Sequence, residues 1–159
     1  MSNSRRKPSI TSDAKNIDVY RLIRKTLAAG NTIDIASVGD SMFPLIKEAN
    51  MCSFMQIIPS ELKKGDIVLF AGADHRLVGH RFMGRDAAGN FICKGDANLR
   101  PDAPVAESQL IGKLQVIRRG TYVLHADGWI CSTWGLIIRY VPLLSRLFRK
   151  YLHLTSAKH

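Results

Sequence analysis

The sequence predicts a mainly β fold: a compact antiparallel β domain, with an amphipathic helix before it and a partly helical extension after it. Between residues 32 and 120, short β-favouring runs alternate with turn segments rich in glycine, proline and aspartate. The chain has 159 residues, of which 46% are hydrophobic and 23% charged. This composition is that of a globular protein, and the length suits one domain with its own core.

The order of the elements follows from changes in hydrophobic period. Residues 17–28 place apolar side chains at helical spacing, and Gly30 follows them as a stop signal. We expect strands in six later runs: 32–38, 51–58, 66–72, 76–85, 90–96 and 110–120. Residues 86–89 have the composition of a hairpin loop. The chain is therefore divided into a basic N-terminal segment (1–31), a β domain (32–120) and an apolar, basic C-terminal extension (121–159).

The net charge of +10 lies at the two ends of the chain. Residues 1–30 hold seven basic and two acidic side chains, and residues 118–159 hold seven and one, whereas the segment between them is nearly neutral. Basic ends are typical of contact with a polyanion or an anionic membrane, and equally of solvated surface. Because no nucleic-acid-binding module is recognisable, we expect no nucleic-acid partner.

No membrane span or secretory signal is expected. The basic start of the chain is not followed by an apolar run, and the most apolar stretch, 129–148, is interrupted by two arginines and a proline. Trp129, Trp134 and Tyr140 suit either a membrane interface or a helix docked on the sheet. We therefore predict a cytoplasmic or peripherally membrane-associated protein.

Cysteine and histidine spacing gives no metal pattern. Cys52, Cys93 and Cys131 are few, odd in number and widely spaced, which indicates neither a disulfide framework nor a zinc site and suits a reducing compartment. His75 and His80 have no CxxC or HExxH spacing around them. We predict no metal.

Ser41 is the first candidate for chemistry. It lies where a strand gives way to a turn, between Gly39, which permits a sharp bend, and Pro44, which fixes φ. Such a turn can expose a hydroxyl and direct N–H groups at a developing oxyanion, although a serine in such a turn is most often only a turn residue. The hydroxyl becomes a nucleophile only where a base takes its proton and a third group holds the base.

His80 is the candidate base. It lies within an apolar strand run, on the same face as Val78 and Phe82. A hairpin centred near residue 88 places His80 opposite Asp96. Asp96 and Asp102 are then the two carboxylates available to orient the imidazole, with turn capping as the other interpretation of both.

Three blocks of residues occur in a fixed order: Gly-Asp-Ser-Met-Phe-Pro at 39–44, Gly-His-Arg-Phe at 79–82, and Lys-Gly-Asp-Ala-Asn at 94–98 followed by Asp102. In this order they resemble the type I signal peptidases, above all the archaeal and endoplasmic-reticulum branch. That branch carries His-Arg in the second block where the bacterial branch carries Lys-Arg. The resemblance covers about residues 32–117.

The resemblance implies a signal-peptidase-like β catalytic domain and serine endopeptidase activity. Carried over by position, Ser41 is the nucleophile, His80 the general base and Asp102 the triad carboxylate. Asp96 is the supporting acid, and Met42 belongs to the nucleophile block. In this family an extended signal or leader peptide adds beside a strand and is held by backbone hydrogen bonds, which requires no cofactor.

Three alternatives remain open. His75 repeats the His-Arg-apolar pattern five residues before His80, but it precedes the strand, so His80 is preferred as the base. A self-cleaving repressor relative would use a lysine base, and Ala29-Gly30 resembles its scissile pair. A catalytically idle relative would bind peptide or membrane through the basic ends. The family normally carries a membrane span before the serine, whereas only a basic helix is expected here.

Overall fold

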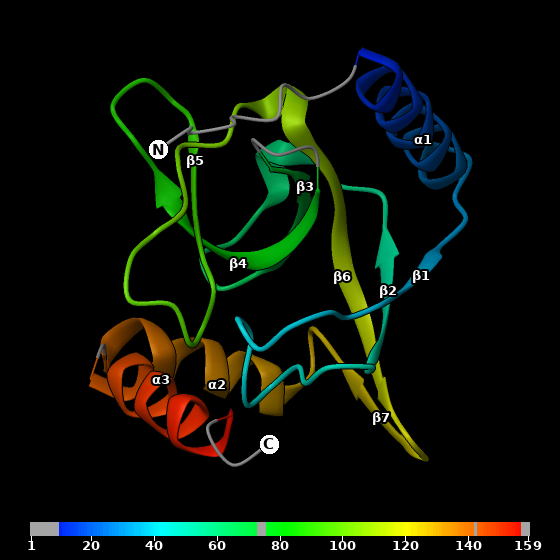
Figure 1. The fold of residues 1–159 in the computed structure, drawn as a ribbon. Coiled ribbons are helices and arrows are strands. Elements are labelled where there is room, and N and C mark those ends of the chain that lie inside the picture. Colours follow the sequence, from blue (N-terminus) through cyan, green and yellow to red (C-terminus); the bar gives the residue numbers. More distant parts are fainter. Residues whose placement is uncertain (1–9, 73–75, 142, 157–159) are drawn as a thin grey trace, which may run out of the picture.

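The computed structural model describes residues 10–72, 76–141 and 143–156, and Figure 1 shows their arrangement. Over these ranges the chain forms a seven-stranded antiparallel sheet and three α-helices. In chain order the elements are α1 (Ile10–Ala28), β1 (Ile33–Ala36), β2 (Met51–Met55), the 3₁₀ turn η1 (Pro59–Glu61), β3 (Ile67–Ala71), β4 (Leu77–Arg85), β5 (Phe91–Lys94), the 3₁₀ turn η2 (Glu107–Gln109), β6 (Leu110–Arg119), β7 (Tyr122–His125), α2 (Trp129–Tyr140) and α3 (Leu143–Ser156). The predicted fold class, mainly β with one helix before the sheet and a helical C-terminal part, is confirmed.

The sheet is organised around the long strand β6. Its strands follow the order β1-β2-β6-β3-β4-β5, and β7 folds back onto β6. Gly120, with a φ of +57°, allows the tight turn that pairs Arg119 with Tyr122. The sheet therefore continues to His125, beyond residue 120, where the sequence placed the end of the β domain.

Helix α1 packs on the sheet through one face. Tyr20 and Leu27 are buried in the main core, and the Arg24 guanidinium donates hydrogen bonds to the carbonyls of Ser108 and Leu110, just where β6 begins. The helix predicted over 17–28 begins earlier, at Ile10. The described part of α1 therefore packs on the β domain through its inner face.

The core has two apolar parts. The first lies between α1, the central strands and the turn after β1, and the second lies between β3, β4 and β5. Its most deeply buried members include Leu27, Leu114 and Ile117 in the first part and Val68, Phe91, Cys93 and Val105 in the second. The turn that carries Ser41, whose Met42, Leu45 and Ile46 belong to the first part, is thereby built onto the core and not onto a free loop.

The β4–β5 hairpin departs by one residue from the predicted register. Near its turn Arg85 pairs with Phe91 and Gly84 with Ile92, as a loop centred near residue 88 requires. A bulge between Phe82 and Gly84 then shifts the pairing, so that Arg81 lies opposite Lys94. The prediction that His80 lies opposite Asp96 is therefore wrong, because one extra residue in β4 changes the register beyond the bulge.

Helices α2 and α3 lie side by side below the sheet (Figure 1). Helix α2 buries Cys131, Gly135 and Ile138, which share one face. The rings of Trp134 in α2 and Phe148 in α3 lie 5.8 Å apart, which joins the two helices. Within the described ranges, none of the helices combines the length and apolarity required to cross a membrane.

Candidate active site

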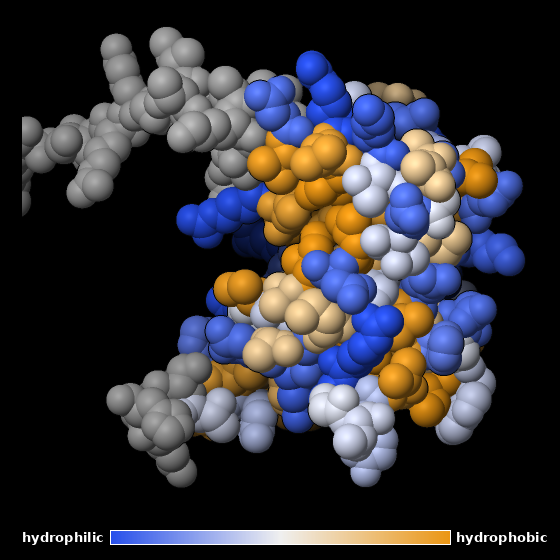
Figure 2. Space-filling model, turned by 90° about the vertical axis from the view of Figure 1, so that its right-hand side faces the viewer, coloured by the Kyte–Doolittle hydropathy of each residue, from blue (hydrophilic) through white to orange (hydrophobic). Residues whose placement is uncertain are grey.

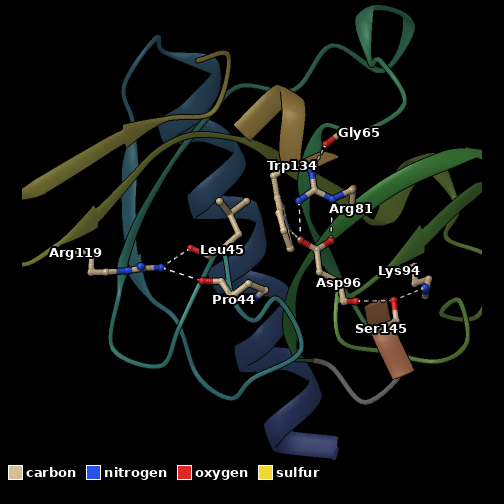
Figure 3. A network of polar contacts seen from close by, with 9 residues as sticks. All are labelled: Pro44, Leu45, Gly65, Arg81, Lys94, Asp96, Arg119, Trp134 and Ser145. Carbon is tan, nitrogen blue, oxygen red and sulfur yellow. Dashed lines mark hydrogen bonds and ion pairs between the residues drawn. The ribbon is translucent and has the colours of Figure 1, made fainter. Parts of the chain in front are cut away.

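The turn that carries Ser41 is fixed on both sides. Gly39 has a φ of +80°, which an L side chain rarely adopts, and the N–H of Phe43 donates to the carbonyl of Asp40. Met42 is 4% exposed and anchors the turn in the core. From the end of β6, the Arg119 guanidinium donates to the carbonyls of residues 44 and 45, at 3.1 and 2.7 Å (Figure 3). Ser41 itself stays half-buried at the surface of this rigid turn.

His80 joins Ser41 to Asp102. Its Nε2 lies 2.9 Å from Ser41 Oγ and its Nδ1 lies 2.6 Å from Asp102 Oδ2. A carboxylate can only accept a hydrogen bond, so Nδ1 carries the proton and Nε2 is free to accept from the Ser41 hydroxyl. This is the arrangement that lets an imidazole take a proton from a serine.

Asp102 reaches His80 because its loop returns to β5. The N–H of Asp102 donates to the carbonyl of Cys93 at 2.8 Å, and the N–H of Ala97 donates to the carbonyl of Ser41, also at 2.8 Å. We call residues 95–102 the acid loop. It places the Asp102 carboxylate beside His80 and supports the backbone of Ser41.

Asp96 lies on the other face of β4, away from His80. The neighbouring strand residue Arg81 binds it with two hydrogen bonds, of 2.8 Å from Nε and 2.7 Å from Nη2, and donates a third to the carbonyl of Gly65. The side chains of Arg81 and Asp96 are 2% and 0% exposed. Trp134 also donates to Asp96, as Figure 3 shows. Asp96 therefore supports the acid loop and does not contact the base.

A cleft of about 520 Å³ runs past Ser41 and His80. Its walls come from β1, β2, β3, β4 and the turn after β1, and are mostly apolar, with Ile35, Val38, Phe54, Leu69 and Leu77 among them. Among the described strands β1 pairs with β2 alone, so its other edge has no strand partner, and Ile35 and Ala36 of β1 line the cleft. On the face that carries α1 and β1, hydrophobic residues gather in a patch (Figure 2). An extended, partly apolar chain fits such a groove better than a compact polar ligand does.

The cysteines lie in apolar surroundings. Burial raises the pKa of Cys52 to about 11 and, together with the charge of Asp102, raises that of Cys93 to about 12. All three thiols are free and buried. Over the part of the chain that the structure describes, no group of three or more histidine, cysteine or acidic side chains is placed to hold a metal ion.

The structure thus brings three of the predicted residues, Ser41, His80 and Asp102, into one hydrogen-bonded line. Asp96 and Met42 lie in supporting positions instead, and His75 lies outside the described residues. Two contributors were missed: Trp134, which was interpreted as an aromatic of either a membrane interface or a docked helix but was given no role in the site, and Ser145 of α3. A serine among the apolar and basic residues of the first turns of α3 was the signal that the sequence offered for the second.

Comparison of the chain with models of known protein families, with curated proteins and with solved structures gives no significant match. The chemistry of the site is therefore inferred from its own geometry.

Proposed function

We propose that the protein is a serine endopeptidase that cleaves an extended peptide segment of the leader or signal-peptide type. The observation that carries the proposal is the hydrogen-bonded line from Ser41 through His80 to Asp102 at the side of an open, apolar cleft. Each member has the role that its chemistry allows: hydroxyl nucleophile, imidazole base and orienting carboxylate.

The reaction proceeds by acyl transfer. Ser41 Oγ attacks the scissile carbonyl carbon while its proton passes to His80 Nε2. The turn's own N–H groups stabilise the oxyanion, and the imidazolium, held by Asp102, then protonates the leaving amine as the C–N bond breaks. Water, deprotonated by the same histidine, hydrolyses the acyl-enzyme and restores the Ser41 hydroxyl.

The test compares the new N-termini produced in cells that express the wild-type protein with those produced by Ser41→Ala at equal abundance. Ser132→Ala is the matched control, because Ser132 is an exposed serine of α2 away from the line. We expect cleavage products with wild type and Ser132→Ala and none with Ser41→Ala. Identical profiles in all three would support the catalytically idle binding protein.

Self-cleavage at Ala29-Gly30 is disfavoured by the local backbone. The N–H groups of both residues donate to helix carbonyls, of Lys25 and Leu27, so this bond lies in the hydrogen-bonded turn that directly follows α1 and not in an extended segment. Prolonged incubation of the purified protein should leave its intact mass unchanged. Loss of the first 29 residues in wild type but not in Ser41→Ala would support the self-cleaving alternative.

We also propose that the peptidase works at the surface of an anionic membrane, bound through α2 and α3. The outward side of these helices exposes large apolar residues: Trp129, Ile130, Leu136, Ile137, Tyr140, Leu143, Leu147 and Leu154. The same two helices carry Arg139, Arg146, Arg149 and Lys150 and no acidic residue. A second copy of the chain would bring like charges together, whereas anionic headgroups complement this surface.

Co-sedimentation with vesicles tests the surface. We expect binding to phosphatidylcholine vesicles that contain phosphatidylglycerol, weakening at high salt, and loss of binding in the triple variant Arg146→Gln, Arg149→Gln, Lys150→Gln. The control neutralises three exposed cations elsewhere, Lys25, Lys63 and Arg100. Equal binding of both triple variants, or a dimer in solution that hides these helices, would contradict the proposal.

A further inference from the structure

The inner faces of α2 and α3 hold one residue of the acid loop from two directions. Trp134 Nε1 donates to Asp96 Oδ2 at 2.9 Å, and Ser145 Oγ donates to the Asp96 backbone carbonyl at 2.7 Å. Figure 3 shows both helices reaching the same aspartate, which Arg81 binds from β4. The carboxylate and the main chain of Asp96 are therefore both fixed by helices that lie outside the catalytic sheet.

The direction of the Ser145 hydrogen bond is set by Lys94. The Lys94 ammonium lies 3.1 Å from Ser145 Oγ and can only donate, so the hydroxyl accepts from it and gives its own hydrogen to the Asp96 carbonyl. Burial lowers the pKa of Lys94, and the nearby charge of Asp96 raises it. Ser145 is 1% exposed, which leaves substrate no access to its hydroxyl.

Through the acid loop, Asp96 is connected to both ends of the Ser41–His80–Asp102 line. The next residue, Ala97, donates its N–H to the Ser41 carbonyl, and the loop ends at Asp102, whose N–H returns to Cys93. Helix α3 also contacts the nucleophile turn, since the Phe43 ring lies 5.8 Å from the ring of Phe148 and 5.7 Å from that of Tyr151. A displacement of the helices is therefore passed to both ends of the Ser41–His80–Asp102 line.

We propose that Trp134 and Ser145 are positioning residues of the active site, which hold Asp96 and, through the acid loop, set the separation of Ser41, His80 and Asp102. The inference rests on the proposed function for its catalytic consequence. Arg81 already balances the charge of Asp96, so the two helical donors contribute orientation and not charge. The C-terminal helices are in this sense part of the catalytic unit.

The test uses the full chain and five single variants. Trp134→Phe removes only the indole N–H, and Ser145→Ala removes only the hydroxyl. The chain offers controls at exposed positions away from these contacts: Tyr122→Phe removes one polar group from an aromatic side chain on β7, and Ser132→Ala makes the serine change on α2. We measure kcat and KM on a synthetic peptide that spans a cleavage site found in the comparison of N-termini. We also measure amide hydrogen exchange at Ala97 and Asp102.

In the two inner variants we expect kcat to fall about tenfold with KM within about twofold, because a loosened catalytic geometry affects the transition state and not the distant peptide contacts. Exchange at the Ala97 and Asp102 amides should accelerate about tenfold, whereas both controls match wild type. A Ser145→Thr variant, which keeps a hydroxyl, should recover protection at these amides.

Unchanged kcat and unchanged loop exchange in folded Trp134→Phe and Ser145→Ala would overturn the inference. If Ser145→Ala reduces the folded fraction, Trp134→Phe carries the test alone. A wild-type protein without peptidase activity would contradict the proposed function, and the exchange rates would still decide whether the two residues position the loop.

Discussion

Strand β4 carries two adjacent side chains, each bound to a carboxylate from the same acid loop, and the two pairs differ in nearly every other respect. His80 pairs with Asp102 on the cleft side, where the aspartate side chain is 24% exposed. Arg81 pairs with Asp96 on the inner side, where both side chains are almost fully buried. Alternation along a strand sends neighbours to opposite faces, so one strand holds the proposed catalytic histidine on one face and a buried ion pair on the other.

The two pairs differ in which partner solvent reaches. In the proposed mechanism His80 needs an unprotonated nitrogen that faces the serine, and its Nε2 lies 2.9 Å from Ser41 Oγ at the cleft, while its partner Asp102 is partly solvated. A buried guanidinium and carboxylate are useful only when every donor and acceptor is matched, as they are here by Gly65 and Trp134. The two aspartates should therefore respond in opposite ways to the same substitution.

Asp102→Asn should separate activity from stability. The amide keeps the shape of the carboxylate but no longer holds His80 in the tautomer that accepts from Ser41, so we expect kcat to fall by about 10⁴. The melting temperature should change little, because the side chain is partly solvated. Steady-state kinetics and thermal unfolding check this, with Asp127→Asn as an exposed control. A loss of less than about tenfold would remove Asp102 from the triad.

Asp96→Asn should show the reverse order. It leaves the Arg81 guanidinium buried without a counter-charge, which costs about 3–5 kcal/mol of unfolding free energy. Urea denaturation measures this. The double variant Arg81→Met, Asp96→Leu should lose less than the single one, since it removes both charges together. A cost below about 1 kcal/mol for Asp96→Asn would mean that water reaches this pair.

Gly95→Ala tests the close approach of the acid loop to the nucleophile turn. A Cβ on Gly95 would lie 2.7 Å from the Ser41 carbonyl oxygen and 2.8 Å from Asn98 Nδ2, so one of them must move. We expect the free energy of unfolding to fall by about 1–3 kcal/mol. We also expect kcat to fall, because the backbone of Ser41 shifts relative to His80.

Gly89→Ala in the β4–β5 turn is the control for Gly95→Ala. It strains a positive φ but meets no neighbour within 4 Å, and it should leave kcat intact. Unchanged kcat in Gly95→Ala would show that the nucleophile turn tolerates displacement.

Much of the catalytic face could be predicted from sequence because its signals are local. Strand alternation placed His80 on a buried face, and the glycine and proline around Ser41 marked the turn. The choice between Asp96 and Asp102 could not be made from spacing alone: the bulge in β4 changes the register, and the acid loop curves back to β5. The resemblance to signal peptidases selected Asp102, the carboxylate that lies 2.6 Å from His80.

The inner face was less predictable because its partners are far apart in the chain. Trp134 lies 38 residues after Asp96, and Ser145 lies 49 residues after it. An indole in an apolar helix indicates membrane interface and packed core equally well. Only the folded arrangement shows that its N–H finds a buried carboxylate. Long-range hydrogen bonds of this kind leave no periodic signal in sequence.

The smallest expected effect concerns the thiol of Cys93, the residue whose carbonyl accepts the hydrogen bond from the Asp102 N–H. The raised pKa of Cys93, about 12 against an ordinary 9.0, means that the folded state keeps its proton where the unfolded chain loses it. This contribution to stability is fully present below pH 9 and is lost as pH rises from 9 toward 12. The pKa of Cys52, raised to about 11, gives a pH dependence of the same sign. The lowered pKa of Lys94 gives one of the opposite sign.

When the pH rises from 8 to 10, we therefore expect the Cys52 and Cys93 thiols each to lower the free energy of unfolding by about 1 kcal/mol. Urea denaturation at the two pH values should show a smaller fall in Cys93→Ala than in wild type. An identical pH dependence in wild type and Cys93→Ala would mean that water reaches the Cys93 thiol. The His80 side of β4 would then be more open to solvent, relative to the Arg81 side, than the exposed fractions of Asp102 and Asp96 indicate.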